Sequence, residues 1–577
     1  MHRDVDETNE DEMDDHRAWR CTAAHIDIDF LEDPLNCPFR VVHPRLNNLL
    51  HSDDHVTAYV VESMRRGVTY TAVRQDKLRY RRAKAMKQTV VLYPVPAMGH
   101  LVPMVELAKL FVLHDFSVAV ILMHTPVKHP SVDPFVARVS SAYPSISFHQ
   151  LPPAASLPDT PVPRFLDLVL PNNPQLLYFL EARSRTSDVR AVVLDFFCTG
   201  ALAVTAKLRL PPYFFFASSA AVLAAFLYLP TLYATADIDL KALGNSPIHF
   251  PGLPPVPASD MPRNMIDRDE DYFKRIIRVL ESLPNADGIL VNSFESLEAE
   301  AVRVLRDGAC IPGRRMPPVY CIGPLIADGS RDVGGEKVEK AECVAWLDEQ
   351  PRGSVVFLCF GSMGMFSAEQ LKEIAAGLER SGQRFLWVVR APRSESQGPQ
   401  GWGSQSEPDL EALFPEGFFE RTKQRGFLAK SWAPQVEVLN HEAVGGFVTH
   451  CGWNSVLEAI TAGVPMIGWP LYAEQGINKV LLVEQMRVAV AMEGCGKELV
   501  AAEEVEARIR WLMESEGGRE LRERAVATKQ RAAEARREAG SSHQAWLDVV
   551  KTLRNASTSL LRTTGLTSED HLKMPCD

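Results

Sequence analysis

The stretch from Trp432 to Gln475 reads WAPQVEVLNHEAVGGFVTHCGWNSVLEAITAGVPMIGWPLYAEQ and decides how the fold is interpreted. Within it, the run 446–449 is predicted to be a buried strand, and a helix is expected to begin near Trp453 or Asn454. The turn between them is His450-Cys-Gly452. A strand, a glycine turn and a helix start present backbone N–H groups and the positive helix end to an anion. The stretch therefore predicts an anion site, and a diphosphate is the obvious occupant.

Several side chains around this turn are suited to the rest of a nucleotide. His450 can donate a hydrogen bond, and Asn454 and Ser455 can donate from the first helical turn. Glu458 lies one turn further along, where a carboxylate can accept hydrogen bonds from two ribose hydroxyls. Trp432 offers a flat face for a base. Each residue alone also has an ordinary structural explanation, so only their joint occurrence in one frame indicates a nucleotide site.

Short apolar runs alternate with helical segments on both sides of this stretch. We predict strands at 89–94, 116–123, 189–195 and 212–216, and a second series at 353–360, 384–389, 445–449 and 465–469. Ser367 to Gln370 has the pattern of a capping box, and a long charged helix is expected at about 505–539. This alternation is typical of doubly wound sheets. The sequence therefore predicts an α/β protein with two Rossmann-like domains, at 86–335 and 336–555.

The ends and the composition of the chain set further bounds. The first fifteen residues are acidic and 65–84 is mostly basic, which predicts a disordered N-terminal extension at 1–85, and a tail is expected at 556–577. The net charge of −11 argues against a nucleic-acid binder. The uncharged run 213–229 is divided by Ser218-Ser219 and flanked by prolines, so we expect a buried strand and helix rather than a membrane span. No signal-peptide pattern is present, which predicts a cytoplasmic location.

Stretch 432–475 resembles, in its 44-residue length and at nearly every marker, the signature box of plant secondary-product UDP-glycosyltransferases. The resemblance extends over about 87–555. It implies GT-B architecture, in which two Rossmann-like doubly wound domains face each other across a cleft. Acceptor binding is expected in 86–335 and UDP-sugar binding in 336–555. The partners implied are a UDP-sugar and a small-molecule acceptor, with no metal, no other cofactor, no nucleic acid and no membrane span, and a monomer is expected.

A catalytic pair is expected in the first domain. His100 follows the first predicted strand, at the carboxyl end of the sheet, where open α/β folds bind ligands. The helix end there disfavours a protonated imidazole, which suits a general base. Asp195 ends another strand of this sheet and can stabilise the imidazolium that forms. Residues 96–100 and 193–197 resemble the family's catalytic His motif and Asp strand, which implies a single displacement with inversion.

The resemblance also implies roles for the remaining residues. Trp432 stacks on uracil, and Gln435 contacts the nucleoside. Glu474 and Gln475 bind the sugar hydroxyls, and a closing Gln goes with UDP-glucose as the donor. Ser362 and Ser218 are expected to make weaker contacts. With these two and the diphosphate and ribose residues above, the expected UDP-sugar site is Trp432, Ala433, Gln435, His450, Gly452, Trp453, Asn454, Ser455, Glu458, Glu474, Gln475, Ser362 and Ser218.

The acceptor is less closely bounded by the sequence. Apolar and aromatic residues at 151–159 and 214–229 are suited to line a pocket for a flat phenolic. The chain resembles most the branch that contains hydroquinone, chalcone and anthocyanidin glucosyltransferases, which implies a phenol such as a flavonoid. Terpenoids and hormones remain open as acceptors.

Four alternative interpretations of the sequence compete with the glycosyltransferase one. An NAD-type oxidoreductase needs Gly-x-Gly-x-x-Gly between a strand and a helix, and neither 96–103 nor 361–364 has it. A zinc site is disfavoured because none of the ten cysteines is in a Cys-x-x-Cys pair, and His441 is expected to be a surface or capping histidine. A protein that binds UDP-sugars without catalysis, and a tethering role for 1–85, both remain open.

Overall fold

The computed structural model describes residues 87–126, 128–154, 164–235, 240–267, 271–327, 341–392, 407–496 and 499–555. The chain divides into two compact units, Met1–Arg82 and Ala83–Asp577, and the description below concerns the second. The predicted extension 1–85 and tail 556–577 lie outside the described residues.

A seven-stranded parallel sheet forms the first half of this unit, in the order β3-β2-β1-β4-β5-β8-β9. Its middle strands are apolar runs covered on both faces, and Val90, Val91 and Leu92 of β1 are fully buried. The strands are β1 Gln88–Tyr93, β2 Ser117–Leu122, β3 Ile146–Gln150, β4 Asp188–Asp195, β5 Pro212–Phe216, β8 Gly288–Val291 and β9 Val319–Cys321. The helices around them are α4 Met98–Leu113, α5 Val132–Ala142, α6 Phe165–Thr186, α7 Leu202–Leu208, α8 Ala220–Thr235, α9 Asp271–Ser282 and α10 Ala299–Asp307.

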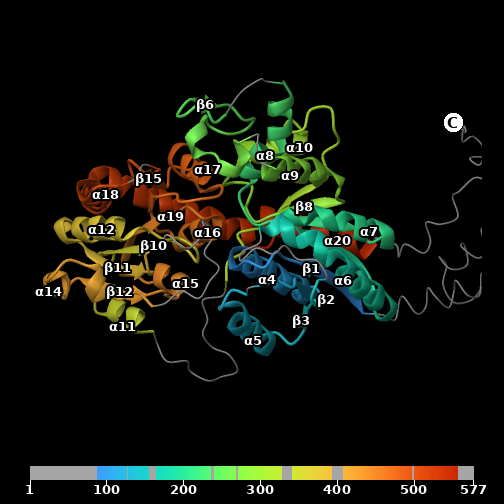
Figure 1. Cartoon of the computed structure of the whole chain (residues 1–577), viewed down its shortest axis with the longest axis horizontal. Coiled ribbons are helices and arrows are strands. Elements are labelled where there is room, and N and C mark those ends of the chain that lie inside the picture. Colours follow the sequence, from blue (N-terminus) through green and yellow to red (C-terminus); the bar gives the residue numbers. More distant parts are fainter. Residues whose placement is uncertain are drawn as a thin grey trace, which may run out of the picture. The chain divides into compact units, whose positions relative to one another are not determined.

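A six-stranded parallel sheet forms the second half, in the order β12-β11-β10-β13-β14-β15 (Figure 1). Its strands are β10 Val355–Cys359, β11 Arg384–Val389, β12 Gly426–Lys430, β13 Val444–Thr449, β14 Met466–Gly468 and β15 Ala489–Ala491. The helices are α11 Glu342–Asp348, α12 Ala368–Ser381, α13 Leu410–Leu413, α14 Phe418–Thr422, α15 Gln435–Leu439, α16 Trp453–Ala462, α17 Gln475–Val480, α18 Ala502–Glu514, α19 Glu516–Arg536 and α20 Ser541–Asn555. The prediction of two parallel, doubly wound α/β sheets is confirmed.

The last helix returns to the first half of the unit. Trp546 of α20 packs edge-on against Phe111 of α4, with ring centroids 4.7 Å apart. Arg554 donates a hydrogen bond to the carbonyl of His114 at 2.9 Å. Figure 1 shows this red helix among the elements of the first half, and it contacts β4 and β9. The buried core of the first sheet therefore contains side chains from the end of the chain.

The single long helix predicted at 505–539 is wrong, because α18 ends at Glu514 and α19 begins at Glu516. Ser515 between them is extended, and its hydroxyl accepts a hydrogen bond from the Gly518 N–H at 3.0 Å. A Cβ on Gly518 would lie 2.2 Å from the carbonyl oxygen of Leu512, so the reversal needs glycine there. The charge pattern alone predicts that one helix continues across Ser515. The serine N-cap and the glycines after it start a second helix instead.

Two smaller expectations were tested by the fold. The Ser367 hydroxyl accepts a hydrogen bond from the Gln370 N–H at 3.2 Å, as a capping box requires. The Gln370 side chain, however, pairs with the backbone of Val500, so the reciprocal bond of the box is not made. The run 213–229 forms β5 and a buried part of α8, as predicted. Among the helices in the described ranges, none combines the length and the hydropathy that a bilayer span requires.

Candidate active site

The predicted site residues gather at the carboxyl ends of strands in both sheets. His100 follows β1, Asp195 ends β4, His450 follows β13 and Glu474 follows β14. The two sets meet, because Asn454 donates a hydrogen bond from its side chain to the carbonyl of Gly99 at 2.9 Å, across 355 residues of sequence. The residue beside His100 therefore contacts the first turn of α16.

His100 and Asp195 form a close pair. His100 Nδ1 lies 2.7 Å from Asp195 Oδ2, and the Asp195 side chain is fully buried whereas that of His100 is 21% exposed. The other Asp195 oxygen, Oδ1, accepts a hydrogen bond from the Phe197 N–H at 3.1 Å, which fixes the carboxylate at the start of the 3₁₀ helix Phe196–Ala201. With Nδ1 facing the carboxylate, Nε2 is the ring nitrogen available to a substrate.

The pKa of His100 is raised, contrary to the expectation from the helix end. Burial lowers this pKa, but the charge of Asp195, the hydrogen bond to it, and the charge of Glu474 together outweigh the burial. Two carboxylates around one imidazole thus stabilise its protonated form. This arrangement suits a base that must become charged during a reaction.

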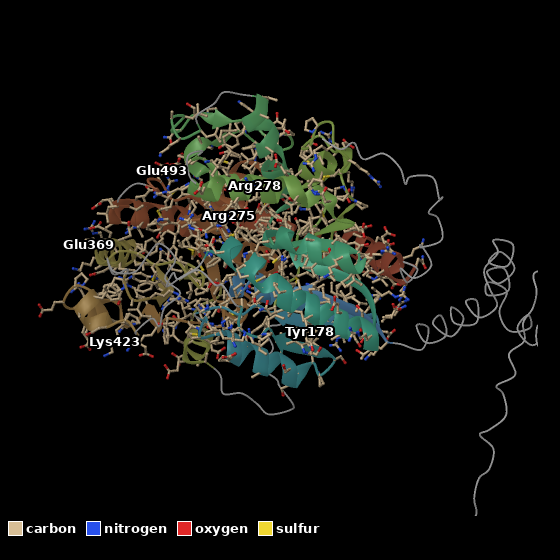
Figure 2. The ribbon with its side chains drawn as sticks, turned by 45° about the vertical axis from the view of Figure 1, so that its right-hand side comes forward. Tyr178, Arg275, Arg278, Glu369, Lys423 and Glu493 are labelled. Atoms are coloured by element: carbon tan, nitrogen blue, oxygen red, sulfur yellow. The ribbon has the colours of Figure 1, made fainter. Side chains whose placement is uncertain are left out.

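Aromatic side chains surround His100. The ring centroids of Phe165, Phe196 and Phe197 lie 5.6, 6.2 and 5.7 Å from that of His100. Phe165 opens α6, and this end of the helix is held to α9 by an ion pair of 2.5 Å between Asp167 and Arg275. Figure 2 labels Arg275 on α9. An apolar wall of this kind is suited to a flat aromatic molecule beside the imidazole.

The segment predicted to line the acceptor pocket at 214–229 packs mainly into the core instead. Phe214, Phe215 and Phe216 are at most 1% exposed, and so are most residues of the first turns of α8. The other predicted segment, 151–159, is described only as far as residue 154. The apolar run therefore reflects burial in the sheet, and the aromatic residues near His100 come from the starts of α6 and of the 3₁₀ helix.

The turn before α16 is built around His450. Cys451 has a φ of 62°, and Gly452 is the N-cap of the helix. A Cβ on Gly452 would lie 2.3 Å from His450 Nε2, and one on Gly361 would lie 2.5 Å from the same atom, so both glycines allow the ring to sit between their loops. Burial, and then the charge of Arg390, lower the pKa of His450 to about 4. His450 is therefore neutral near pH 7 and can act as a hydrogen-bond donor.

Three predicted nucleotide residues form one cluster. The Gln435 amide donates to the Ser455 hydroxyl at 2.8 Å and to Glu458 Oε2 at 2.6 Å. Burial raises the pKa of Glu458 to about 7, although the hydrogen bond from Gln435 lowers it. Among the described residues, the hydrogen bond from the neutral Gln435 thus fixes the Glu458 carboxylate on α16, where it can accept further hydrogen bonds.

The remaining nucleotide residues lie at neighbouring strand ends. Trp432 follows β12 and is 66% exposed, so its flat face is free of core packing. Ala433 beside it is buried. Ser362 follows β10 next to Gly361, which has a φ of 74°. These positions are compatible with a base on Trp432 and phosphates between the β10 loop and α16.

The residues predicted to bind the sugar make contacts of their own. Ser218 donates to Glu474 Oε1 at 3.0 Å and so joins the two halves. The Gln475 side-chain oxygen accepts from the N–H groups of Leu471 and Tyr472 at 2.9 and 3.0 Å, which leaves its NH₂ group as the end available for donation. Trp453 is 2% exposed, and its indole donates to the carbonyl of Asn292 at 2.7 Å, so it ties α16 to β8.

A buried carboxylate fixes the start of α8 behind Ser218. Glu298 is fully buried and accepts hydrogen bonds from the N–H groups of Ala220 and Ala221 at 3.0 and 2.9 Å, and from the Ser293 hydroxyl. The pKa of Glu298 is raised, because the effect of burial exceeds the opposing effect of these hydrogen bonds. The carboxylate thus caps α8 from a distant segment, and it holds the strand end that carries Asn292.

Sequence reasoning missed several of these residues. Phe196 and Phe197 directly follow Asp195, so their place beside the pair was accessible from the sequence. Arg390 directly follows β11, and its charge lowers the pKa of His450. Its position just after a strand is the one signal in the sequence that pointed to it. Asn292 and Glu298 carry no local signal. His441 contacts Asp348 and the Ala443 N–H, as a capping histidine does. In the described part of the chain, no group of three His, Cys, Asp or Glu side chains is placed to hold a metal.

Comparisons with known proteins agree with this geometry. Residues 326–516 match the family model described as UDP-glucoronosyl and UDP-glucosyl transferase. UDP-glycosyltransferase 88B1 of Stevia rebaudiana is 46% identical over 459 residues, which are 78% of this chain and 96% of that protein. Phloretin 2'-O-glucosyltransferase of Pyrus communis is 45% identical, over 81% of this chain and 100% of that protein. The structure of Phytolacca americana UGT2 complexed with UDP-2fluoro-glucose and pterostilbene is similar with a TM-score of 0.73 at 35% identity, over 81% of this chain and 100% of that one.

Proposed function

Because the chain belongs to the plant family 1 UDP-glycosyltransferases, enzymes of GT-B fold, we propose that it transfers glucose from UDP-glucose to a phenolic hydroxyl with inversion. The observation that carries the proposal is the 2.7 Å contact between His100 and Asp195, next to the first turn of α16. A buried carboxylate behind a partly exposed imidazole is the arrangement that a general base requires.

In the proposed step, His100 Nε2 takes the proton of the acceptor hydroxyl as its oxygen attacks the anomeric carbon. The new bond to that oxygen forms while the bond from the anomeric carbon to the diphosphate breaks, and UDP leaves with the electron pair. Asp195 stabilises the imidazolium that results. The raised pKa of His100 supports this role, because it reports a site that favours the charged ring.

The proposed donor site runs along the carboxyl ends of the second sheet. Trp432 and Ala433 flank the base, and Gln435 and Glu458 hold the nucleoside. The neutral His450, with Gly452, Asn454, Ser455 and Ser362, receives the diphosphate at the start of α16. We assign the sugar to Trp453, Glu474 and Gln475, with Ser218 contributing from the first half. This division places acceptor binding in 86–335 and donor binding in 336–555.

A phenolic acceptor is supported by two independent observations. Phe165, Phe196 and Phe197 border His100, so a flat ring can pack beside the base. Phloretin, in the name of one relative, and pterostilbene, in the complex of the Phytolacca americana structure, are both phenols. A flavonoid is therefore the acceptor class to test first.

The test measures UDP release from UDP-glucose with a panel of flavonoids and simple phenols. The parent protein is expected to release UDP in the presence of an acceptor, and His100→Ala is expected to lose about 10²–10⁴-fold of that rate, the range of general-base catalysis. His249→Ala, at an exposed histidine of the first half, is the matched control and should keep the parental rate. Equal rates for His100→Ala and the parent would overturn the assignment of the base, and no UDP binding by the parent would overturn the donor assignment.

A further inference from the structure

An ion pair joins the two halves behind the proposed sugar site. Lys479 Nζ of α17 lies 2.7 and 2.8 Å from Oδ1 and Oδ2 of Asp260, which ends the 3₁₀ helix Ala258–Asp260 of the first half. The two side chains are only 16% and 12% exposed. Since Lys479 contacts both carboxylate oxygens and water is largely excluded, this pair differs from the exposed ion pairs elsewhere on the described surface.

The backbone at this point is as close as the side chains. A Cβ on Gly476 would lie 2.2 Å from the carbonyl oxygen of Asp260, so α17 contacts the 3₁₀ helix at a position where any larger residue would displace it. α17 therefore contacts the first half through close backbone packing at Gly476 and through the ion pair of Lys479.

This contact lies one turn along α17 from the residues assigned to the sugar, before the helical backbone continues into the π-helical turn Leu481–Gln485. α17 has six residues, Gln475–Val480, so Lys479 is about 6 Å along the axis from Gln475 at a rise of ~1.5 Å per residue. At the near end, Glu474 is tied to Ser218 of the first half. α17 is thus attached to the half that holds His100 at Glu474, its N-cap, and again one turn later at Lys479.

We propose that the Asp260–Lys479 pair is a positioning device that fixes α17, and with it Glu474 and Gln475, so that the donor's sugar is held relative to His100. The inference rests on the proposed sugar-binding role of these two residues. In the proposed site UDP contacts α16 and the β10 and β12 loops. The turn before α16 is itself tied to α17, because Asn478 donates a hydrogen bond to the Cys451 carbonyl at 3.0 Å, whereas Glu474 and Gln475 belong to the start of α17. Loss of the pair should consequently weaken recognition of the sugar more than binding of UDP.

The experiment uses the full chain with Lys479→Met, Asp260→Asn and the double variant. Removing either partner leaves the other charge buried and lets α17 shift, and displacements of about 1 Å at a site can cost up to ~10²-fold. We expect KM for UDP-glucose to rise about tenfold in each single variant, with the Kd of UDP within about twofold of the parental value. The double variant should be no worse than the worse single one, because the two residues act as a unit.

Matched controls carry the same changes at exposed sites. Lys423→Met, at a lysine that follows α14 on the surface (Figure 2), and Asp271→Asn at the start of α9 should keep parental KM values. Single variants with unchanged KM would overturn the proposal. A parallel rise in KM and in the Kd of UDP would also overturn it, because that result reports general damage to the fold.

A readout that needs no turnover separates this proposal from the proposed function. Amide hydrogen exchange in α17 should become faster in Lys479→Met and Asp260→Asn than in the parent, and stay parental in the two controls. If the parent releases no UDP from UDP-glucose, the proposed function fails. The exchange measurement then decides alone, and unchanged protection of α17 would refute the ion pair as the device that fixes this helix.

Discussion

Replacing Glu458 by glutamine should stabilise the ligand-free protein and weaken its binding of UDP. Among the residues that the structure describes, the Glu458 carboxylate accepts its hydrogen bond from the neutral Gln435, which also donates to Ser455, and burial raises the pKa of Glu458 from 4.5 to about 7. The folded state therefore binds the proton of this carboxyl more tightly than the unfolded state does. The stability gained in this way is fully present below pH 4.5 and is lost as the pH rises through about 7.

The magnitude follows from this difference in pKa. Each unit of pKa corresponds to about 1.4 kcal/mol, so the ionised carboxylate costs roughly 3 kcal/mol above pH 7 if no screening acts. Glu458 keeps partial contact with solvent, and we reduce this figure to about 1–2 kcal/mol. Glutamine preserves the shape and can still accept the hydrogen bond from Gln435, but it is never charged. The stabilisation should be near zero at pH 5 and reach its full value at pH 8.

Thermal unfolding at pH 5 and pH 8 tests the stability, and calorimetric titration with UDP tests the binding. At pH 8 the midpoint of Glu458→Gln should rise by a few degrees, as expected for about 1–2 kcal/mol in a domain of this size. The affinity for UDP should fall roughly ten- to hundredfold, since hydrogen bonds to a charged acceptor contribute about 1.5–3 kcal/mol each. Glu484→Gln, at an exposed position, is the control. A stability difference that does not depend on pH would refute the reasoning.

Three further predictions concern single side chains. Asp195→Asn should lower kcat about 10²–10⁴-fold. In the parent, the raised pKa of His100 places the acid limb of the pH–rate profile above pH 6.5, and the variant should move this limb to lower pH. An acid limb at the parental pH would contradict the pairing of Asp195 with His100. Trp432→Ala should raise the Kd of UDP about 5- to 150-fold, because stacking contributes about 1–3 kcal/mol. The thermal midpoint should not fall, because the ring is 66% exposed. Titration calorimetry and thermal unfolding measure the two quantities, and a lowered midpoint would show that the ring packs in the core. Glu298→Ala should destabilise the protein by about 3–5 kcal/mol, because three buried donors lose their acceptor, and a melting point equal to that of the parent would count against that network.

The central strands could be predicted from the sequence because their physics is local. A parallel strand covered on both faces must be a continuous apolar run, and β5 and β11 have the predicted bounds. The strands β3, β8, β9, β12 and β15 were not predicted, since runs of three to five residues give little periodicity to detect. The break between α18 and α19 was missed because the charge pattern continues across Ser515.

The site was predictable to the extent that it lies at strand ends. His100, Asp195 and the turn at His450 were located by this rule, and the distance between His100 and Asp195 agrees with it. Contacts between the halves have no such signal. Nothing near Asn292 or Asp260 in the sequence indicates that the first accepts from Trp453 and the second binds Lys479. Such pairs depend on how two sheets pack, which no local pattern records.

The return of α20 to the first sheet has a consequence for synthesis on the ribosome. Trp546, Val549, Val550 and Leu553 complete a core whose other members lie between Val90 and Leu325, so the chain makes them more than 200 residues earlier. The N-terminal half thus emerges first and keeps an apolar surface uncovered until the last helix has left the exit tunnel, a period in which chaperones can bind it. A chimera that exchanges donor halves accordingly needs two crossovers, the second between Arg536 and Ser541, so that each acceptor half keeps its own final helix.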